Sequence, residues 1–424
     1  MGCDMLVALS RATRDGGTLF GHNCNRPGDE ELALVREPGR TFAPGETVQA
    51  GDRPLPQVRR THTVLAGRRP GQWGYEHGLN EHGVSIGLTT IRTKRAQGPP
   101  ALTGPELLRL GLERAASARQ AVDVLTDLVG RHSQGAAELE VDPAFLITDA
   151  REAFVVEMFG PHWAVQHVGE VRAVSDVCHL RQDWDHLSPG LADLAIARGW
   201  WPGDGSKLDF AGVAAPEGGD NAASLRRWGR ATLLLEQENG QVNLPVVRRI
   251  LSDHAGGFGN LGGASALCQH APARTAASLI TQSGPGDALP VAWYSFGPPC
   301  ANVYFPLFPA GEFPNAFLAP QGGAGGQPHV AGGIREAQRP PSVLPRNALA
   351  GLQERFDRET GEFLAEAAEL RQRGEADQLP RLAELFMRHV LECWENICLE
   401  FAPVQAPSRR VHAESEYHSS GAWS

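Results

Sequence analysis

The sequence predicts a layered α+β domain that carries an additional helical segment toward its C-terminal end. Three observations lead to this fold class. The first hundred residues alternate short apolar runs with turns, two helical segments with clear start signals follow, and strand-like and helical segments then alternate up to about residue 308. Such an order suits sheets that are covered by helices. Spacing alone leaves the topology of the sheets open.

The N-terminal region is predicted to be rich in strands. Asp4–Ser10 and Thr18–Asn23 flank a glycine-containing turn and predict a hairpin. Arg26–Leu55 is rich in Pro and Gly, and we interpret it as a loop. Further strands are expected over Thr61–Leu65, Trp73–Glu76 and Val84–Thr90.

Two helices are predicted next, each from a capping box. Thr103 stands three residues before Glu106, and Ser117 stands three before Gln120. An antiparallel meander should follow over Ala144–Thr148, Ala153–Met158 and Trp163–Val168. Later helices are expected over Leu191–Arg198, Ala222–Glu236 and Leu244–Asp253, and later strands over Ala276–Thr281 and Val291–Phe296.

The C-terminal part predicts two helices within Ala348–Leu399. They follow Pro309–Pro341, which Gly, Pro and Ala dominate and which we interpret as a long surface connection. The second helix carries an apolar face, which must pack on the main domain or on a second copy of the chain: Leu382, Phe386, Val390, Cys393 and Ile397. The chain therefore divides into a main domain (1–308), a connection (309–345), a helical segment (346–402) and a polar tail (403–424).

Composition excludes several classes of protein. With 424 residues, 42% hydrophobic and 21% charged, the chain is not disordered throughout. A net charge of -10 without clustered Lys and Arg argues against nucleic acid or an anionic membrane as partner. No apolar run approaches the ~20 residues of a membrane span, and no signal-peptide core is present. Seven thinly spread cysteines make no disulfide framework, so we expect a cytoplasmic protein with reduced thiols.

Cys3 is the most informative single residue. A cysteine at the head of the first strand is suited to act as a nucleophile whose own α-amine is the base. The amine titrates near ~7.7–8 and the thiol near ~8.5, so both can exchange protons around neutral pH. The alternative is a small buried hydrophobe at a strand end. Cys24 is either a second thiol near the same site or a half-buried strand cysteine.

Several segments in order resemble the secernin and dipeptidase-like branch of the cysteine N-terminal nucleophile hydrolases. Together they span most of residues 3 to 300: Cys3–Leu9, Gly21–Pro27, Trp73–Glu76, Asn80–Gly87, Leu107–Arg114, Phe145–Asp149 with Glu157, and Val171–Asp176. The resemblance implies a four-layer αββα sandwich. It also implies an N-terminal cysteine that attacks a dipeptide or other small C–N amide bond through an acyl-enzyme. We expect no cofactor.

The same resemblance assigns roles to particular residues. Cys3 would be the nucleophile, and Thr89 lies close to where an asparagine would help to form the oxyanion hole. Arg227 matches an arginine that steadies the site electrostatically. At three positions the chain departs from the family: His22 stands for a Lys or Arg beside the thiol, Asn25 for an aspartate that holds the α-amine, and Asp176 for an asparagine. Arg26, Trp73 and Tyr75 are the candidate substrate-binding residues.

These departures lead to two hypotheses. Removing Met1 alone leaves Gly2 in front of Cys3, so Gly2 must also be cleaved if the α-amine is to act as base. The changes at Asn25 and Asp176 are interpreted as a compensating exchange, in which Asp176 orients the α-amine or pairs with His22 or Arg227. Unrelated drift in an inactive relative is the alternative.

Three functions remain open from the sequence. The first is a cysteine amidohydrolase, the second an acyltransferase on the same scaffold, and the third a decayed secernin-like protein that acts by interaction. His22, Arg26 and Arg227 favour a carboxylate-bearing ligand, although solvation explains Arg26 equally well. Metal-ligand residue types occur at Asp253, His254, Cys268 and His270. Their spacing is irregular and lacks the paired Cys-x-x-Cys pattern of zinc sites, so we expect no metal.

Overall fold

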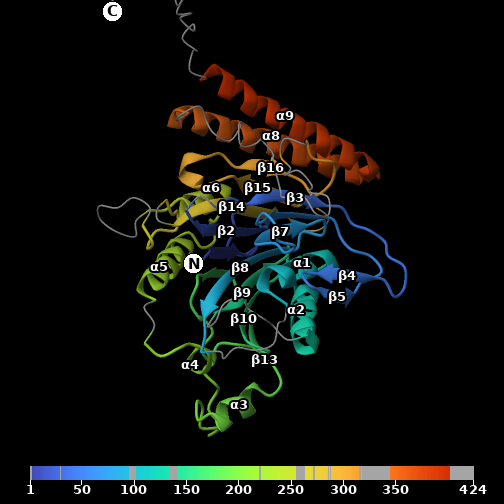
Figure 1. Cartoon of the computed structure of the whole chain (residues 1–424). Coiled ribbons are helices and arrows are strands. Elements are labelled where there is room, and N and C mark those ends of the chain that lie inside the picture. Colours follow the sequence, from blue (N-terminus) through green and yellow to red (C-terminus); the bar gives the residue numbers. More distant parts are fainter. Residues whose placement is uncertain are drawn as a thin grey trace, which may run out of the picture.

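The structure is a computed structural model of the chain (Figure 1). It describes residues 2–28, 30–94, 102–132, 141–218, 221–254, 263–270, 273–284, 286, 288–314, 317 and 344–401. Most of the predicted connection Pro309–Pro341, the polar tail and the glycine-rich stretch 255–262 lie outside the described residues.

One sheet contains the N-terminal strand near its edge. Its six strands are ordered β12-β1-β2-β14-β15-β16, and every pairing is antiparallel. The register places Asp4 opposite Asn23 and Met5 opposite His22. The strands are β1 (Asp4–Ala8), β2 (Thr18–Pro27), β12 (Val171–Val174), β14 (Ala273–Ser283), β15 (Val291–Ser295) and β16 (Phe305–Leu307).

A second sheet has eight strands in the order β13-β11-β10-β9-β8-β7-β6-β3. It is also antiparallel, and β4 (Thr47–Ala50) and β5 (Arg53–Pro56) form a separate two-stranded ribbon. The eight strands are β3 (Ala33–Glu37), β6 (Val64–Arg68), β7 (His77–Asn80), β8 (Ser85–Arg92), β9 (Val141–Thr148), β10 (Ala153–Phe159), β11 (His162–His167) and β13 (His186–Leu187).

Helices cover the outer faces of the two sheets, so the predicted αββα sandwich is confirmed (Figure 1). α1 (Gly104–Arg114) and α2 (Ala118–His132) pack on the eight-stranded sheet, and their apolar faces close one hydrophobic core. α5 (Ala222–Gln237) and α6 (Leu244–Leu251) pack on the six-stranded sheet. The short helices α3 (Leu191–Ala197) and α4 (Phe210–Ala214) lie in the long connection after β13.

The two sheets face each other across a core, and Gly87 marks a close approach between them. A Cβ atom on Gly87 of β8 would lie 2.7 Å from Phe20 Cζ and 2.8 Å from Met5 Sδ, both in the other sheet. Such distances are too short for a real side chain. Glycine inside a strand is therefore required here by the packing of the facing sheet.

The C-terminal helices α8 (Arg346–Gln372) and α9 (Leu379–Glu400) lie side by side over β16 (Figure 1). The connecting elements η1 (Pro299–Ala301) and η3 (Ala376–Gln378) are short 3-10 turns. The ring centroids of Phe305 and Trp394 are 5.3 Å apart, and those of Phe308 and Phe363 are 4.7 Å apart. The main domain therefore covers the apolar face of the pair.

Three sequence predictions need correction. Arg26–Leu55 is not all loop, because it contains the end of β2 together with β3, β4 and β5. Trp73–Glu76 is not a strand, and the strand lies in the following segment as β7. The innermost side chains of α9 include Met387 and Trp394, whereas Leu382, Phe386 and Ile397 of the predicted face are only half-buried.

Candidate active site at Cys3

Cys3 lies directly before β1, where the two sheets meet. Its side chain is only 4% exposed, and its Sγ is 3.7 Å from Cys24 Sγ on the neighbouring strand β2. Its backbone nitrogen donates to Thr89 Oγ1 at 3.0 Å, and Thr89 belongs to β8 of the other sheet. The structure therefore brings Cys3, Cys24 and Thr89 together. The Thr89 hydroxyl holds the nitrogen of Cys3, and its role in an oxyanion hole stays a prediction.

The environment favours a thiolate at Cys3. A hydrogen bond with Cys24, followed by His22 and Arg26, lowers the pKa of the Cys3 thiol well below its ordinary value, although burial opposes the shift. Burial, and then the hydrogen bond with Cys3, raises the pKa of Cys24. Of the two thiols, Cys3 is thus the one that loses its proton first as the pH rises. Thiolates are the reactive form of cysteine, so Cys3 is the nucleophile candidate.

Asn25 connects the N-terminal backbone to the acidic part of the site. Its Nδ2 donates to the Gly2 carbonyl at 3.1 Å and to Asp4 Oδ2 at 3.0 Å. Its Oδ1 accepts from Thr275 Oγ1 at 2.8 Å. The Asn25 amide can bond with both the Asp4 carboxylate and the Thr275 hydroxyl, because its nitrogen donates and its oxygen accepts.

Arg227 lies between two carboxylates. Its Nε donates to Asp4 Oδ1 and Oδ2 at 3.0 and 3.1 Å, and its Nη2 forms an ion pair with Asp176. The predicted pairing of Asp176 with Arg227 is thus present. Burial raises the pKa of Asp4 to about 6, although Arg227 opposes the shift. Asp4 is a site residue that the sequence reasoning missed; a carboxylate inside an apolar strand was the available signal.

His22 is the first member of a buried chain of polar rings. Its Nε2 lies 3.0 Å from the Leu88 carbonyl, and its Nδ1 lies 2.6 Å from His77 Nδ1. His77 Nε2 in turn lies 3.4 Å from the Tyr294 hydroxyl. Burial lowers the pKa of His77 well below its ordinary value, so His77 is neutral. Neither His77 nor Tyr294 was expected from the sequence, because only the fold brings them to His22.

The candidate substrate-binding residues are split between two places. Arg26 lies near the two thiols and forms a buried ion pair with Glu76. Tyr75 is fully buried and Trp73 half-buried in the core beneath α1, where the Arg109 guanidinium lies 4.2 Å from the Trp73 ring centroid. Within the described part of the chain, no hydrogen bond joins Trp73 or Tyr75 to Cys3. Their role in binding substrate stays a prediction.

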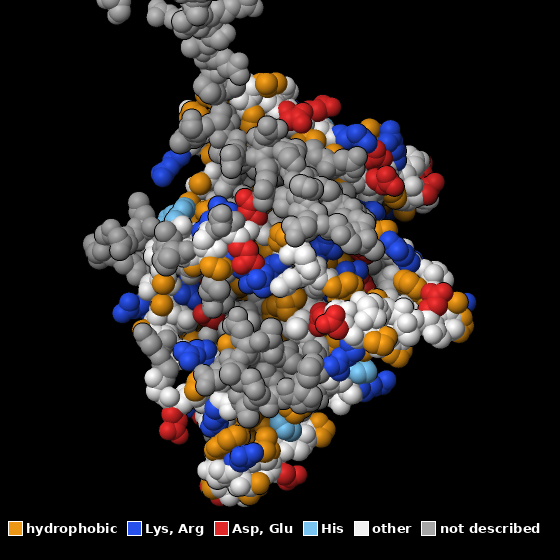
Figure 2. All heavy atoms as spheres, in the orientation of Figure 1, with side chains coloured by type: hydrophobic (Ala, Val, Ile, Leu, Met, Phe, Trp, Pro, Cys, Tyr) orange, Lys and Arg blue, Asp and Glu red, His pale blue; other side chains and the backbone are white. Residues whose placement is uncertain are grey.

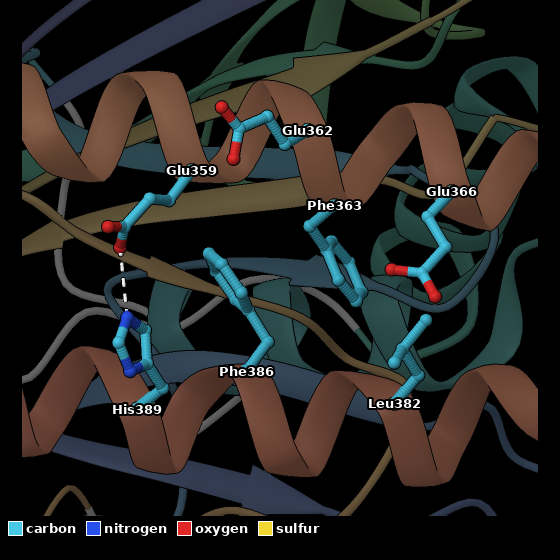
Figure 3. Close-up of a pocket in the computed structure, with 7 residues that line it drawn as sticks. All are labelled: Glu359, Glu362, Phe363, Glu366, Leu382, Phe386 and His389. Atoms are coloured by element: carbon cyan, nitrogen blue, oxygen red, sulfur yellow. Dashed lines mark hydrogen bonds and ion pairs between the residues drawn. The ribbon is translucent and has the colours of Figure 1, made fainter.

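Two cavities among the described residues lie away from Cys3. One, of about 400 Å³, lies between α8 and α9, where Glu359 and His389 form an ion pair at 3.0 Å (Figure 3). The other, of about 330 Å³, lies beside β2, α6 and α8. Figure 2 shows acidic and basic side chains intermixed over the visible face.

Solved structures with a similar chain trace are hydrolytic enzymes by name. A mutant of the conjugated bile acid hydrolase from Clostridium perfringens is 13% identical with a TM-score of 0.42, and the match covers 69% of this chain and 89% of that chain. Penicillin V acylase from Agrobacterium tumefaciens is 14% identical with a TM-score of 0.42, covering 72% and 86%. A Caenorhabditis elegans N-acylethanolamine-hydrolyzing acid amidase ortholog is 12% identical with a TM-score of 0.33, covering 65% and 91%.

Because each TM-score is below 0.5, these likenesses say nothing about the activity of this chain. No protein-family model matches the sequence. In the described ranges, no helix combines the length and apolarity that a membrane crossing needs.

Proposed function

We propose that this chain is a cysteine N-terminal nucleophile amidohydrolase, which cleaves the C–N bond of a small amide or dipeptide through an acyl-enzyme on Cys3. The observation that carries the proposal is the placement of Cys3 at the head of β1, with its backbone nitrogen 3.0 Å from Thr89 Oγ1 and its Sγ 3.7 Å from Cys24 Sγ. The lowered pKa of its thiol supports the same role. The membership in the secernin and dipeptidase-like branch belongs to the same proposal.

The proposed reaction uses the thiolate and the α-amine of the same residue. In the resting state the proton of the thiol resides on the α-amine of Cys3, which Thr89 holds from the other sheet. The thiolate attacks the amide carbonyl carbon, and the ammonium gives its proton to the leaving nitrogen as the C–N bond breaks. The neutral amine then takes a proton from water, whose oxygen releases the acyl group.

The reaction requires removal of Gly2, and the site holds this residue firmly before cleavage. The Gly2 carbonyl accepts a hydrogen bond from Asn25. A Cβ atom at position 2 would lie 1.8 Å from Asp176 Cγ, so a side chain there cannot be accommodated. We infer that cleavage of the Gly2–Cys3 bond leaves the new amine next to Thr89, Asn25 and Asp176.

The test combines intact mass with steady-state hydrolysis of a panel of dipeptides and acyl amides. An active protein should begin at Cys3, and Cys3→Ala should lose activity entirely. Cys398→Ser is the matched control, because Cys398 is half-buried on α9 and its substitution should leave activity unchanged. A chain that hydrolyses amides while it retains Gly2 would contradict the α-amine mechanism.

Two rival functions have distinct outcomes in the same experiment. Acyl transfer to an added amine faster than to water would identify an acyltransferase. A folded, correctly processed protein that is inactive on the whole panel would favour the interaction protein and contradict the proposal.

A further inference from the structure

Four metal-binding side chains from three separate segments converge outside the candidate active site. They are His254, just after α6, Cys268 and His270, ahead of β14, and Cys300 in η1. Their ligand atoms all lie within 4.8 Å of one another. His254, Cys268 and His270 were recognised in the sequence as metal-ligand residue types, but Cys300, which follows His270 after 30 residues, was missed. The fold therefore assembles a Cys2His2 set that the spacing conceals.

The contacts among these groups crowd around one nitrogen of His270. His270 Nε2 lies 3.1 Å from His254 Nε2, 3.6 Å from Cys268 Sγ and 3.2 Å from Cys300 Sγ. One imidazole nitrogen carries either one proton or one lone pair, so it makes at most one strong, near-linear hydrogen bond with these three partners. A cation at the centre would instead accept all four groups as ligands.

The separations also match a tetrahedral zinc centre. Zinc binds thiolate sulfur at ~2.3 Å and imidazole nitrogen at ~2.0–2.1 Å, so neighbouring ligands of a tetrahedron lie roughly 3.3–3.8 Å apart. The Cys268–His270 distance of 3.6 Å lies within this range, and the distances of 3.1 and 3.2 Å from His270 to His254 and Cys300 lie slightly below it. Two thiolates and two imidazoles form a donor set that is typical of zinc, whereas Mg²⁺ and Ca²⁺ favour oxygen ligands.

The backbone around the four groups is held independently of a metal. The Cys268 nitrogen donates to the Asp253 carbonyl at 3.1 Å, which fixes the chain just before His254. The Asp253 carboxylate receives Arg230 Nε at 3.2 Å and Nη2 at 2.9 Å. Cys268 is buried, whereas His254 and Cys300 are half-buried and His270 is exposed. A metal ion can thus reach a preformed site from solvent.

We propose that His254, Cys268, His270 and Cys300 bind one Zn²⁺ ion as a structural site. All four positions of the tetrahedron come from the protein, which leaves none for water or substrate. Both thiols lose their protons to solvent when the ion binds. This inference does not depend on amide hydrolysis.

The proposed zinc site would stabilise the segment 263–270, which contacts residues of the candidate active site. The Ala264 carbonyl accepts a hydrogen bond from Arg227. Gln269 donates its backbone nitrogen to Thr275 Oγ1 at 3.1 Å, and the same hydroxyl contacts Asn25. Zinc at Cys268 and His270 would therefore hold the C-terminal end of the segment 263–270 beside Thr275 and Asn25, while Arg227 holds its other end at Ala264.

The first test measures the metal content of the full-length protein by inductively coupled plasma mass spectrometry. The wild type and the control Cys398→Ser should hold about one zinc per chain, whereas Cys300→Ser and His270→Ala should hold little. If a variant fails to fold, the wild type alone still decides: the chelated protein should take up one equivalent of added Zn²⁺, and Co²⁺ should give the absorption of tetrahedral thiolate ligation. A chelated wild type that binds neither ion overturns the proposal.

The second test uses the thiols themselves. Alkylation of Cys268 and Cys300 should be slow with zinc bound and should become fast after chelation, while Cys398 reacts equally in both states. Peptide mapping under non-reducing conditions must find both thiols free. A Cys268–Cys300 disulfide in the purified protein, or equal alkylation with and without zinc, would contradict a zinc site.

Discussion

At the scale of single residues, Asp4 changes the interpretation of the site. The sequence comparison drew attention to Asn25 and Asp176 as two exchanged positions, and the structure confirms that Asp176 pairs with Arg227. The carboxylate that contacts Asn25 is however Asp4, which also contacts Arg227 and Ser175. A comparison of sequences cannot show the contact between Asp4 and Arg227, because the two residues meet only through the packing of α5 on β1.

Asn25→Asp should therefore damage the site through Asp4. The new carboxylate would replace a donor that lies 3.0 Å from Asp4 Oδ2, so two like charges would meet in a buried position. We expect kcat/KM to fall by roughly 10- to 1000-fold, the range of a pKa perturbation of ~1–3 units. Adding Asp4→Asn should recover a large part of the loss, measured as a double-mutant cycle. Additive losses would show that the two positions act separately.

The pH profile of activity should report Asp4. Burial raises the pKa of this carboxyl to about 6, so below pH 6 it becomes protonated and loses its charge opposite Arg227. We expect kcat/KM to decrease on the acid side with a midpoint near this value, since the thiol itself titrates well below its ordinary pKa. Asp4→Asn should lack the acid limb. An unchanged limb in that variant would assign the titration to another group.

At the scale of elements, local signals predicted some segments well and missed others. The capping box of α1 is present as expected, with the Thr103 nitrogen donating to Glu106 Oε2 at 2.7 Å. The strands β3 and β7 were missed because long-range pairing defines them: β6 is the partner of both. Glycine is common in turns, yet Gly78 lies inside β7. Propensity cannot distinguish a turn glycine from one that a neighbour requires.

Gly78→Ala should test this explanation. A Cβ atom there would lie 2.7 Å from Leu112 Cδ1 of α1 and 2.8 Å from the Leu65 carbonyl. Overpacking of this kind destabilises a protein by about 1–3 kcal/mol. The control is Gly229→Ala on α5, where a Cβ atom meets nothing within 4 Å and the helix should gain up to ~1 kcal/mol. Urea unfolding of both variants measures the difference, and equal stabilities would refute the packing argument.

At the scale of the whole molecule, the C-terminal helices share a core with the sandwich. Leu352, Phe356 and Trp394 belong to the same hydrophobic cluster as the strands β1 and β14. The sequence predicted that an apolar face needs a cover, but it left open whether the main domain or a second copy supplies it. The aromatic contacts with β16 show that the main domain supplies the cover. They could not be predicted, because the sequence of the intervening connection does not indicate where the helices pack.

Trp394→Ala should destabilise the whole molecule. The side chain is 3% exposed and packs on Phe305, so its truncation should cost about 3–5 kcal/mol. Leu399→Ala on the same helix is the control, because Leu399 is 74% exposed and its substitution should change stability by less than about 0.5 kcal/mol. Thermal unfolding checks both. A small effect of Trp394→Ala would mean that α9 can leave the sandwich without loss.

The glycine at position 87 has a consequence for any attempt to stabilise this protein by mutagenesis. Gly87 lies two residues before Thr89 on β8, and it sets how near β8 comes to Met5 and Phe20. A larger residue would act as a wedge and would lift the Thr89 hydroxyl away from the nitrogen of Cys3. Substitutions at Gly87 should thus lower both stability and turnover, because they overpack the space between the sheets. Stabilising changes on the outer helices should leave turnover intact.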